Sequence, residues 1–415
     1  MLISVVGLGY VGLPTAALLA SRGIKVLGVD VDPRVVEGVN NGRIHIEEAD
    51  LDAIVQVAVG KGLLLATTKP APADVFMIAV PTPFHNGRPD TSYVERAARM
   101  IAPVLRAGNL VVLESTSPVG TTESVCRLLS QARPDLKFPD SDSNELQVSI
   151  AYCPERILPG KVLHELVNND RIIGGLTERC TKRAIAFYQL FCEGQCLPTT
   201  ARTAELCKLM ENAFRDVNIA FANEMSLVCE RFGINVWELL RLANRHPRVN
   251  ILEPGPGVGG HCVAVDPWFI VSSAPEQTRL IRAAREINDS MPHNVLKKIR
   301  AYAVELNSNG SLRPGIACLG LTYKPDVNDI RESPALAISE EISRWGDCDV
   351  FVAEPHLQEL PGDLAGKNHV IMTSASEAIA RAGIVALLVN HRQFSHIERA
   401  SLAGKKIVDT RGVWS

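Results

Sequence analysis

The chain has 415 residues, and its 43 Lys and Arg nearly balance its 46 Asp and Glu, which gives a formal charge of -3. This length predicts two or three domains, and 46% hydrophobic with 21% charged residues is typical of a globular chain, not a disordered one. The charge balance argues against a nucleic-acid-binding protein, which usually carries a basic excess.

The N-terminal segment MLISVVGLGYVGLPTAALLASRG is apolar enough to imitate a signal peptide or a membrane span. It has no Lys or Arg before Arg22, so the basic region of a signal peptide is missing, and glycines and a proline interrupt it. The ten cysteines include no CxxC pair, and a chain of this length needs no disulfides. We therefore expect a cytoplasmic protein with no membrane contact, no metal and mostly buried thiols.

Short apolar runs alternate with helical patterns through the first half of the chain. Four runs have the composition of strands buried on both faces: Leu2–Val6, Lys25–Val29, Val75–Val80 and Leu110–Leu113. Helical patterns lie between them, for example at 14–22 and 94–105, and a polar stretch at 134–145 predicts a surface loop. This alternation predicts βαβ units and a parallel sheet.

The middle of the chain differs, because residues 203–232 contain no Gly or Pro and carry apolar side chains at helical spacing up to Gly233. A helix of this length spans about 45 Å and suits a spine between domains with a face for a partner subunit. After a polar break at 307–314, strand patterns return at 316–320, 349–353 and 384–389, with a helix at 333–345.

These patterns predict an α/β fold with two doubly wound Rossmann-like domains joined by a central α-helical domain with a long spine helix. The predicted boundaries are 1–198, 199–306 and 307–415. The two outer domains echo each other, because the strand that ends at Asp30 has a counterpart that ends near Glu354.

The strongest local motif is Gly7-Leu8-Gly9-Tyr10-Val11-Gly12, which follows a predicted strand, opens a helix and precedes Asp30 by 18 residues. Its glycines permit the turn, the approach of a pyrophosphate and close helix–strand packing, while Asp30 suits the ribose hydroxyls of NAD and repels a 2′-phosphate. We expect the residues of this motif that bind NAD to be Gly7, Gly9, Tyr10, Val11, Gly12 and Asp30. Three threonines after later strands are candidates to line the same cofactor: Thr82, Thr116 and Thr122. The alternative is a tight turn without a ligand.

A second glycine-rich segment, 254–260, precedes His261 and Cys262. A thiol placed after such a loop can attack a carbonyl group and form a covalent intermediate. Asp266 follows four residues later. The alternative is a buried structural cysteine, which is the usual state of this residue type.

Polar side chains on the predicted spine helix share one face. Lys208 and Asn212 there are suited to stabilising an alkoxide or an oxyanion, although a solvated stripe is the alternative. Arg215 lies on the same helix face. Cations near predicted loops of a negatively charged chain indicate a diphosphate ligand: Arg156, Arg245, His246, Arg248, Lys324, Arg331 and Arg411.

The motifs GLGYVGLP, TPF, ESTSPVGTT, CPER, EN-x-FRD, GPGVGGHC-x3-D, K-x6-RESP and DTRG occur in this order over essentially the whole chain. In this they resemble the UDP-glucose/GDP-mannose dehydrogenase family. Longer segments such as RTAELCKL and INVWELLRLANRHPRVNIL are similar to the bacterial UDP-N-acetyl-D-mannosamine dehydrogenases. The UDP-glucose branch tends to have Ser where His261 stands.

The resemblance implies oxidation of the C6 alcohol of UDP-N-acetyl-D-mannosamine to the acid with two NAD, through a thiohemiacetal and a thioester on Cys262. Lys208 and Asn212 would hold the oxyanion, and Asp266 and Glu155 are the candidates for activating water. Arg331 would contact NAD. The implied substrate contacts are Arg156, Ile157, Lys208, Asn212, Arg215, His246, Arg248, Gly259, Tyr323, Lys324 and Arg411. Tyr323 stands where Phe is common in relatives.

The resemblance also implies a homodimer formed through the central helical domain, with His246 and Arg248 acting across the interface, and a product suited to surface polysaccharide synthesis. Two alternatives stay open. The same chemistry on UDP-N-acetylglucosamine or UDP-glucose would need only a different pocket. A non-catalytic protein that binds NAD or a nucleotide sugar is disfavoured, because the proposed nucleophile and its polar partners are all present.

Overall fold

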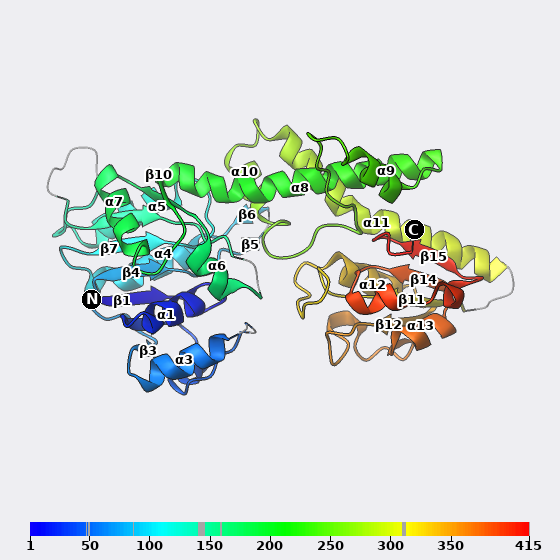
Figure 1. Cartoon of the computed structure of the whole chain (residues 1–415), viewed down its shortest axis with the longest axis horizontal. Coiled ribbons are helices and arrows are strands. Elements are labelled where there is room, and N and C mark those ends of the chain that lie inside the picture. The colour runs from blue at the N-terminus through cyan, green and yellow to red at the C-terminus, as the bar shows by residue number, and fades with distance from the viewer. Residues whose placement is uncertain are drawn as a thin grey trace. The chain divides into compact units, whose positions relative to one another are not determined.

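The computed structural model describes residues 1–46, 48, 50–85, 87–139, 146–157, 160–308 and 313–414. The chain forms two compact units. Unit 1 comprises Met1–Glu211 and Trp268–Pro275, and unit 2 comprises Asn212–Pro267 and Glu276–Ser415. Figure 1 colours them along the chain, with the first sheet in blue to green and the second in orange to red.

The sheet of unit 1 runs in the order β10-β9-β8-β7-β4-β1-β2-β3. Its strands are β1 (Leu2–Val6), β2 (Lys25–Val29), β3 (Leu64–Thr67), β4 (Val75–Ile78), β7 (Leu110–Leu113), β8 (Ser149–Tyr152), β9 (Arg171–Gly175) and β10 (Cys196–Thr200). Neighbours from β3 to β8 pair in parallel, as the sequence predicts. β9 pairs antiparallel with β8, so the edge beyond β8 is reversed.

Helices cover both faces of this sheet, so its strands are buried on both sides. One core contains α1 (Gly12–Ser21), α3 (Leu51–Gly60), α6 (Val162–Asn168) and α7 (Glu178–Tyr188). The other contains α4 (Ser92–Ile101) and α5 (Thr121–Ala132). Helix α2 (Pro33–Asn40), the short 3-10 helix η1 (Ala102–Val104) and the hairpin of β5 (Phe84–His85) and β6 (Arg88–Pro89) complete the unit. The helix predicted over 94–105 therefore ends early, where Pro103 cannot continue it.

The spine helix is confirmed as α8 (Ala201–Phe232), and Gly233 follows it with a φ of 67°. Next come α9 (Val236–Ala243), α10 (Asp266–Ser273) and α11 (Arg279–Ser308). The 30-residue α11 was not predicted, because Pro292 lies within it and it runs into the predicted polar break at 307–314. The part of that break at 309–312, and 140–145 of the predicted surface loop, lie outside the described residues.

The sheet of unit 2 has the order β13-β12-β11-β14-β15, and every pair is parallel. The strands are β11 (Gly315–Leu319), β12 (Asp349–Ala353), β13 (Val370–Met372), β14 (Ile384–Leu387) and β15 (Lys406–Asp409). They are accompanied by α12 (Pro334–Arg344), α13 (Ala375–Arg381), η2 (Gly362–Leu364), η3 (Arg392–His396) and η4 (Arg399–Leu402). The predicted α/β class with two Rossmann-like sheets and a long helix between them in the chain is confirmed.

The echo between the two sheets extends to atomic detail. Gly7 and Gly320 each follow the first strand of their sheet with a φ of 93°. The Leu8 N–H donates to Asp30 Oδ2 at 2.9 Å, and the Leu321 N–H donates to Glu354 Oε2 at 2.7 Å. In both sheets a carboxylate at the end of the second strand thus fixes the first turn. Among the described residues, no helix combines the length and apolarity needed to cross a membrane.

Candidate functional site

The glycine motif of unit 1 forms a tight turn between β1 and α1. A side chain at Gly12 would place its Cβ 1.8 Å from the carbonyl oxygen of Gly7, so only glycine fits there. Gly9 differs, because a Cβ at this position would meet no atom within 4 Å and would point into open space. Asp30 fixes the turn by accepting from the N–H groups of Leu8 and Asp32. This arrangement fits a bound dinucleotide, whose pyrophosphate needs close access to the backbone.

The three candidate threonines differ in what their hydroxyl groups contact. Thr82 is buried, and its hydroxyl has no hydrogen-bond partner in the described part of the chain, which suits a position that a ligand completes. Thr116 is half-buried. Thr122 is fully buried and donates its hydroxyl to Glu205 Oε1 at 2.7 Å. Tyr10 beside the turn is exposed, and Val11 is half-buried.

Glu205 is a residue that sequence reasoning missed. From α8 it accepts the N–H groups of Gly120 (2.6 Å) and Thr122 (2.8 Å) at the start of α5. Its burial raises the pKa of this carboxyl, while the hydrogen bonds from Thr122 and Gly120 act in the opposite direction. Glu205 therefore anchors the first turns of α8 to the sheet of unit 1. Nothing in its local sequence distinguishes it from other helix glutamates.

In unit 2, Cys262 lies in a turn that leads directly into α10. Its carbonyl oxygen accepts the Asp266 N–H at 2.9 Å, so the thiol and the Asp266 carboxyl lie one helical turn apart. Asn212 of α8 donates to Asp266 Oδ2 at 2.5 Å, and both side chains are buried. Cys262 itself is exposed. The structure thus brings together three of the predicted catalytic residues.

The glycine-rich loop packs closely against the segment that follows β11. A Cβ at Gly259 would lie 2.5 Å from the carbonyl oxygen of Glu332, and one at Gly260 would lie 2.8 Å from the Tyr323 ring. The Gly260 N–H donates to the carbonyl of Arg331 at 3.1 Å. Backbone contact of this closeness is why the loop before Cys262 is rich in glycine.

A buried polar network, which was not predicted from the sequence, holds the glycine-rich loop in place. Asn223 Oδ1 accepts the Gly255 N–H at 2.8 Å, and Asn223 Nδ2 donates to Asn288 Oδ1 of α11 at 2.8 Å. Asn288 donates in turn to Asp216 Oδ1 at 2.8 Å, and Asp216 forms a buried ion pair with Arg285 at 2.6 Å. The network therefore joins α8, α11 and the glycine-rich loop.

Several predicted anion-binding side chains also gather in unit 2. Burial lowers the pKa of Lys324; the charge of Asp329 acts in the opposite direction, and that of Arg215 lowers the pKa further. The Lys324 ammonium lies 5.6 Å from the centre of the Tyr323 ring. Burial lowers the pKa of Arg411 to about 10, and a Cβ at Gly255 would lie 2.7 Å from its guanidinium. Cations on the loops of unit 2 are suited to binding an anion of high charge.

Three further cations of unit 2 are exposed. His246 and Arg248 lie on the turn after α9, where the Arg248 N–H donates to His246 Nδ1 at 3.3 Å. Arg331 forms an ion pair with Asp329 at 2.7 Å. A contact between Arg331 and NAD stays a prediction, because the glycine turn that suits NAD belongs to unit 1.

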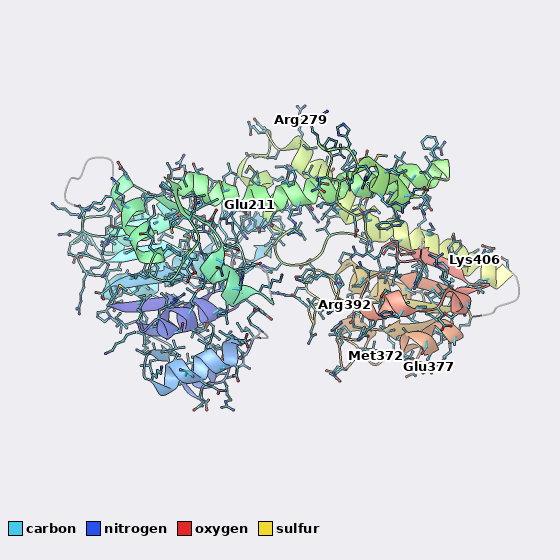
Figure 2. All side chains as sticks on the ribbon, viewed as in Figure 1. Glu211, Arg279, Met372, Glu377, Arg392 and Lys406 are labelled. Carbon is cyan, nitrogen blue, oxygen red and sulfur yellow. The ribbon has the colours of Figure 1, made fainter. Side chains whose placement is uncertain are left out.

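The remaining predicted residues belong to unit 1. Glu155 is buried and Arg156 and Ile157 are half-buried in the segment after β8. Arg156 donates to Glu211 Oε1 at 2.9 Å; Glu211 lies on α8, where Figure 2 labels it. Lys208 is half-buried on the same helix, one turn before Asn212.

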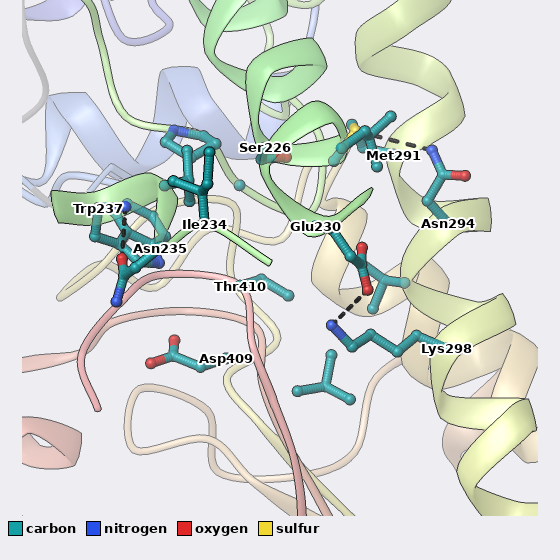
Figure 3. A pocket seen from close by; sticks show the side chains of 16 residues that line it. Ser226, Glu230, Ile234, Asn235, Trp237, Met291, Asn294, Lys298, Asp409 and Thr410 are labelled. Carbon is teal, nitrogen blue, oxygen red and sulfur yellow. Dashed lines mark hydrogen bonds and ion pairs between the residues drawn. The ribbon is translucent and has the colours of Figure 1, made fainter. Parts of the chain in front are cut away.

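Unit 2 also contains a pocket of about 300 Å³ between α8, α9, α11 and β15 (Figure 3). Trp237, Ile234 and Met291 give it apolar walls, and Glu230 with Lys298 contributes an ion pair of 2.9 Å. No predicted catalytic or substrate-binding residue is among those that line it. The pocket is therefore a feature of the central helices that is separate from the predicted contacts.

Comparison with known proteins gives consistent matches. A protein from Ralstonia nicotianae described as an NDP-N-acetyl-D-galactosaminuronic acid dehydrogenase is 57% identical, over 100% of this chain and 96% of its own. The UDP-N-acetyl-D-mannosamine dehydrogenase of Yersinia pestis is 54% identical over 99% of both chains. The structure of a UDP-D-ManNAc dehydrogenase from Pyrococcus horikoshii superposes with a TM-score of 0.88 at 38% identity, covering 100% of this chain and 96% of the other.

Three family models match successive parts of the chain. Residues 1–192 match an NAD binding domain, 202–290 a central domain and 317–415 a UDP binding domain. These matches make the chain an NAD-dependent oxidoreductase with a UDP-binding domain. Since one family accounts for nearly the whole length, and relatives more than half identical span it, the chain belongs to the UDP-glucose/GDP-mannose dehydrogenase family.

Proposed function

We propose that the protein oxidises the C6 alcohol of UDP-N-acetyl-D-mannosamine to the acid with two NAD, in the cytoplasm and for surface polysaccharide synthesis. The observation that carries the chemistry is the exposed Cys262 thiol, one helical turn from a buried Asp266 that Asn212 orients. The relatives named for this substrate support the choice of sugar.

The chain's own residues account for the chemical steps. NAD supplies a hydride acceptor for C6 in each of two oxidations. Lys208 and Asn212 stabilise negative charge on the C6 oxygen while a base takes the hydroxyl proton. The Cys262 thiolate then adds to the aldehyde carbon, and the oxygen takes a proton to give a thiohemiacetal.

Loss of the second hydride and of the hydroxyl proton leaves a thioester on Cys262. Water gives up a proton to Asp266 or Glu155 and adds to C6. The sulfur–carbon bond then breaks, which releases the acid as product and restores the Cys262 thiolate. Because the aldehyde stays bound to sulfur, it does not escape between the two oxidations.

Cations supply recognition of the diphosphate. Arg215, Lys324 and Arg411 offer positive charge in unit 2, and their loss should weaken substrate binding more than it slows turnover. We assign the sugar and nucleotide contacts to Gly259 and Tyr323 together with Arg156, Ile157, His246 and Arg248.

A second candidate substrate is a nucleotide-linked N-acetylgalactosamine. The relative at 57% identity is named for the galactosaminuronic acid, so the choice between the two hexosamines depends on pocket shape. UDP-N-acetylglucosamine and UDP-glucose complete the set to be tested.

We further propose a homodimer that forms along α8. Six large apolar side chains of this helix are 39% to 72% exposed and follow one another at spacings of four or seven residues, which places them on one side: Leu206, Met210, Phe214, Phe221, Val228 and Phe232. An exposed apolar stripe of this kind favours a second copy of the same helix. The division into domains at 1–198, 199–306 and 307–415 stays a prediction.

The test incubates purified protein with NAD and each UDP sugar and counts NADH per sugar consumed. Two NADH with UDP-N-acetylmannosamine, and little with the other sugars, supports the proposal, whereas one NADH with released aldehyde contradicts the covalent route. Cys262→Ala should abolish acid formation, while Cys229→Ala, a buried thiol on α8, serves as the control. Light scattering of Phe221→Asp should show a monomer if α8 forms the dimer.

A further inference from the structure

Glu155, which we assign to water activation, is held in a buried ion pair. Its Oε2 atom accepts from Arg171 Nη1 at 2.6 Å, and the two side chains are 6% and 2% exposed. Its Oε1 atom accepts the N–H of Arg156 at 2.7 Å. Both carboxylate oxygens are therefore fixed, so the orientation of Glu155 depends on where Arg171 is held.

Arg171 is itself fixed by the fold, because it is the first residue of β9. Its Nη2 atom donates to the carbonyl oxygen of Leu166 in α6 at 2.9 Å, and its backbone N–H donates to the Gln195 carbonyl at 2.7 Å. Its guanidinium carbon lies 5.7 Å from the centre of the Tyr188 ring at the end of α7. A strand and two helices thus converge on one guanidinium.

A second buried carboxyl, that of Glu114, faces the same guanidinium. Glu114 follows β7 and accepts the Tyr188 hydroxyl at 2.6 Å, and its other oxygen has no partner among the described residues. Its burial raises its pKa to about 7, and the charge of Glu155 adds to this, while Arg171 and Tyr188 act in the opposite direction. Near neutral pH the group is therefore partly protonated.

We propose that Arg171, Tyr188 and Glu114 are positioning residues that act through Glu155. Arg171 holds the Glu155 carboxylate in a fixed orientation, and Tyr188 with Glu114 completes the buried surroundings of Arg171. When Glu114 is protonated, it no longer competes with Glu155 for the positive charge of Arg171. Four side chains from four segments of unit 1 thus form one cluster that orients the Glu155 carboxylate.

The proposal rests on the proposed function, because it assumes that Glu155 takes a proton from the water that attacks the Cys262 thioester. Without Arg171, the buried Glu155 carboxylate loses its ion-pair partner and its fixed orientation. It is then no longer held where it can take a proton from the attacking water. The thioester should still form, but its hydrolysis should become slow.

The experiment measures rapid NADH formation and the intact mass of the protein after mixing with NAD and the UDP sugar. Arg171→Met should give a burst of two NADH per site, then turnover reduced about 100-fold, the scale of lost general base catalysis. The thioester on Cys262 should accumulate and be visible as added mass. Tyr188→Phe should give the same pattern in weaker form.

Arg183→Met is the matched control. Arg183 is also a partly buried arginine of unit 1, but it donates to the Asn109 carbonyl (3.0 Å) and to Ser149 Oγ (3.3 Å), at the amino ends of β7 and β8. The reactive carboxyl groups lie at the opposite ends of these strands. A general loss of packing should therefore appear in both arginine variants, whereas thioester accumulation should appear only in Arg171→Met.

Glu114→Gln tests the shared charge without removing the hydrogen bond from Tyr188. The titratable groups that face Glu114 are Arg171, Tyr188, Glu155 and the buried Cys153. Since glutamine cannot ionise, the rate of thioester decay in this variant, relative to the parent protein, should rise as pH passes through 7. An unchanged ratio from pH 6 to 8 contradicts the role of Glu114.

The outcomes separate the two proposals. If the parent protein forms no NADH with any UDP sugar, the proposed function fails and this inference fails with it. If the parent protein forms two NADH while Arg171→Met loses burst and turnover in parallel without added mass, only the inference is overturned. If Arg171→Met does not fold, the same readouts on Tyr188→Phe and Glu114→Gln decide, and normal thioester decay in both overturns it.

Discussion

Asn223→Ala removes the buried amide through which α8 holds the glycine-rich loop. Asn223 is fully buried, accepts the Gly255 N–H and donates to Asn288 Oδ1, each at 2.8 Å. Alanine would leave one donor, the Gly255 N–H, and one acceptor, Asn288 Oδ1, without their partner in a buried position. At about 1–3 kcal/mol for each such group, the variant should lose roughly 2–6 kcal/mol of the free energy of unfolding.

Asn218→Ala is the matched control on the same helix. Asn218 is half-buried and binds the same segment, donating to the Asn250 carbonyl at 3.2 Å and accepting the Leu252 N–H at 2.9 Å. Water can replace these partners, so the expected loss is about 1 kcal/mol. Urea unfolding at 25 °C measures both variants, and hydrogen exchange of the peptide over 250–262 reports on the Gly255 amide. Equal losses in the two variants, with the Gly255 amide still protected, would refute the reasoning.

The remaining predictions concern the turns and the buried carboxyl. Gly12→Ala should lower the melting temperature, because its Cβ would lie 1.8 Å from a carbonyl oxygen, whereas Gly9→Ala should leave the melting temperature unchanged and weaken NAD binding measured by calorimetry. Tight NAD binding by Gly9→Ala would show that its open side does not face the cofactor. Gly260→Ala, at a φ of 83° and 2.8 Å from the Tyr323 ring, should raise KM for the UDP sugar and slow alkylation of the Cys262 thiol. The pKa of Glu114 rises from 4.5 to about 7 on folding, so its ionisation destabilises the protein as pH rises through this window. Glu114→Gln should therefore gain stability over the parent between pH 4.5 and 7, by on the order of 3 kcal/mol, and chemical unfolding at several pH values checks this.

Local sequence signals predict much of this fold because they reflect local physics. The apolar runs predict strands β1, β2, β4 and β7 of unit 1 and β11, β12 and β14 of unit 2, and β12 begins and ends at the predicted residues. Strands β3, β8, β9, β10, β13 and β15 were not predicted. The turn at Gly7 is predicted because its backbone angle and its close packing both require glycine. Asp30 follows from the same pattern, and it contacts that turn directly.

The unpredicted features depend on contacts between distant parts of the chain. Helix α11 continues through Pro292 because side chains such as Asn288 and Arg285 bind α8, and this packing outweighs the local cost of a proline. The roles of Glu205 and Arg171 have no local signature either, because a buried carboxylate or guanidinium is recognised only by the partners it meets in space. The antiparallel pairing of β9 with β8 has no local signature either, because it depends on the path by which the chain returns to the edge of the sheet.

The uneven exposure of the ten cysteines determines which thiols react first with alkylating or oxidising reagents. Cys262 is exposed, Cys196 and Cys207 are half-buried, and the other seven are buried. Burial raises the pKa of Cys196 to about 11 and that of Cys318 to about 12, which keeps these thiols protonated and slow to react. An alkylating reagent or a peroxide therefore finds one accessible sulfur first. If Cys262 is the nucleophile, as proposed above, a thiol reagent counts the active sites, and one oxidation event is enough to inactivate the protein.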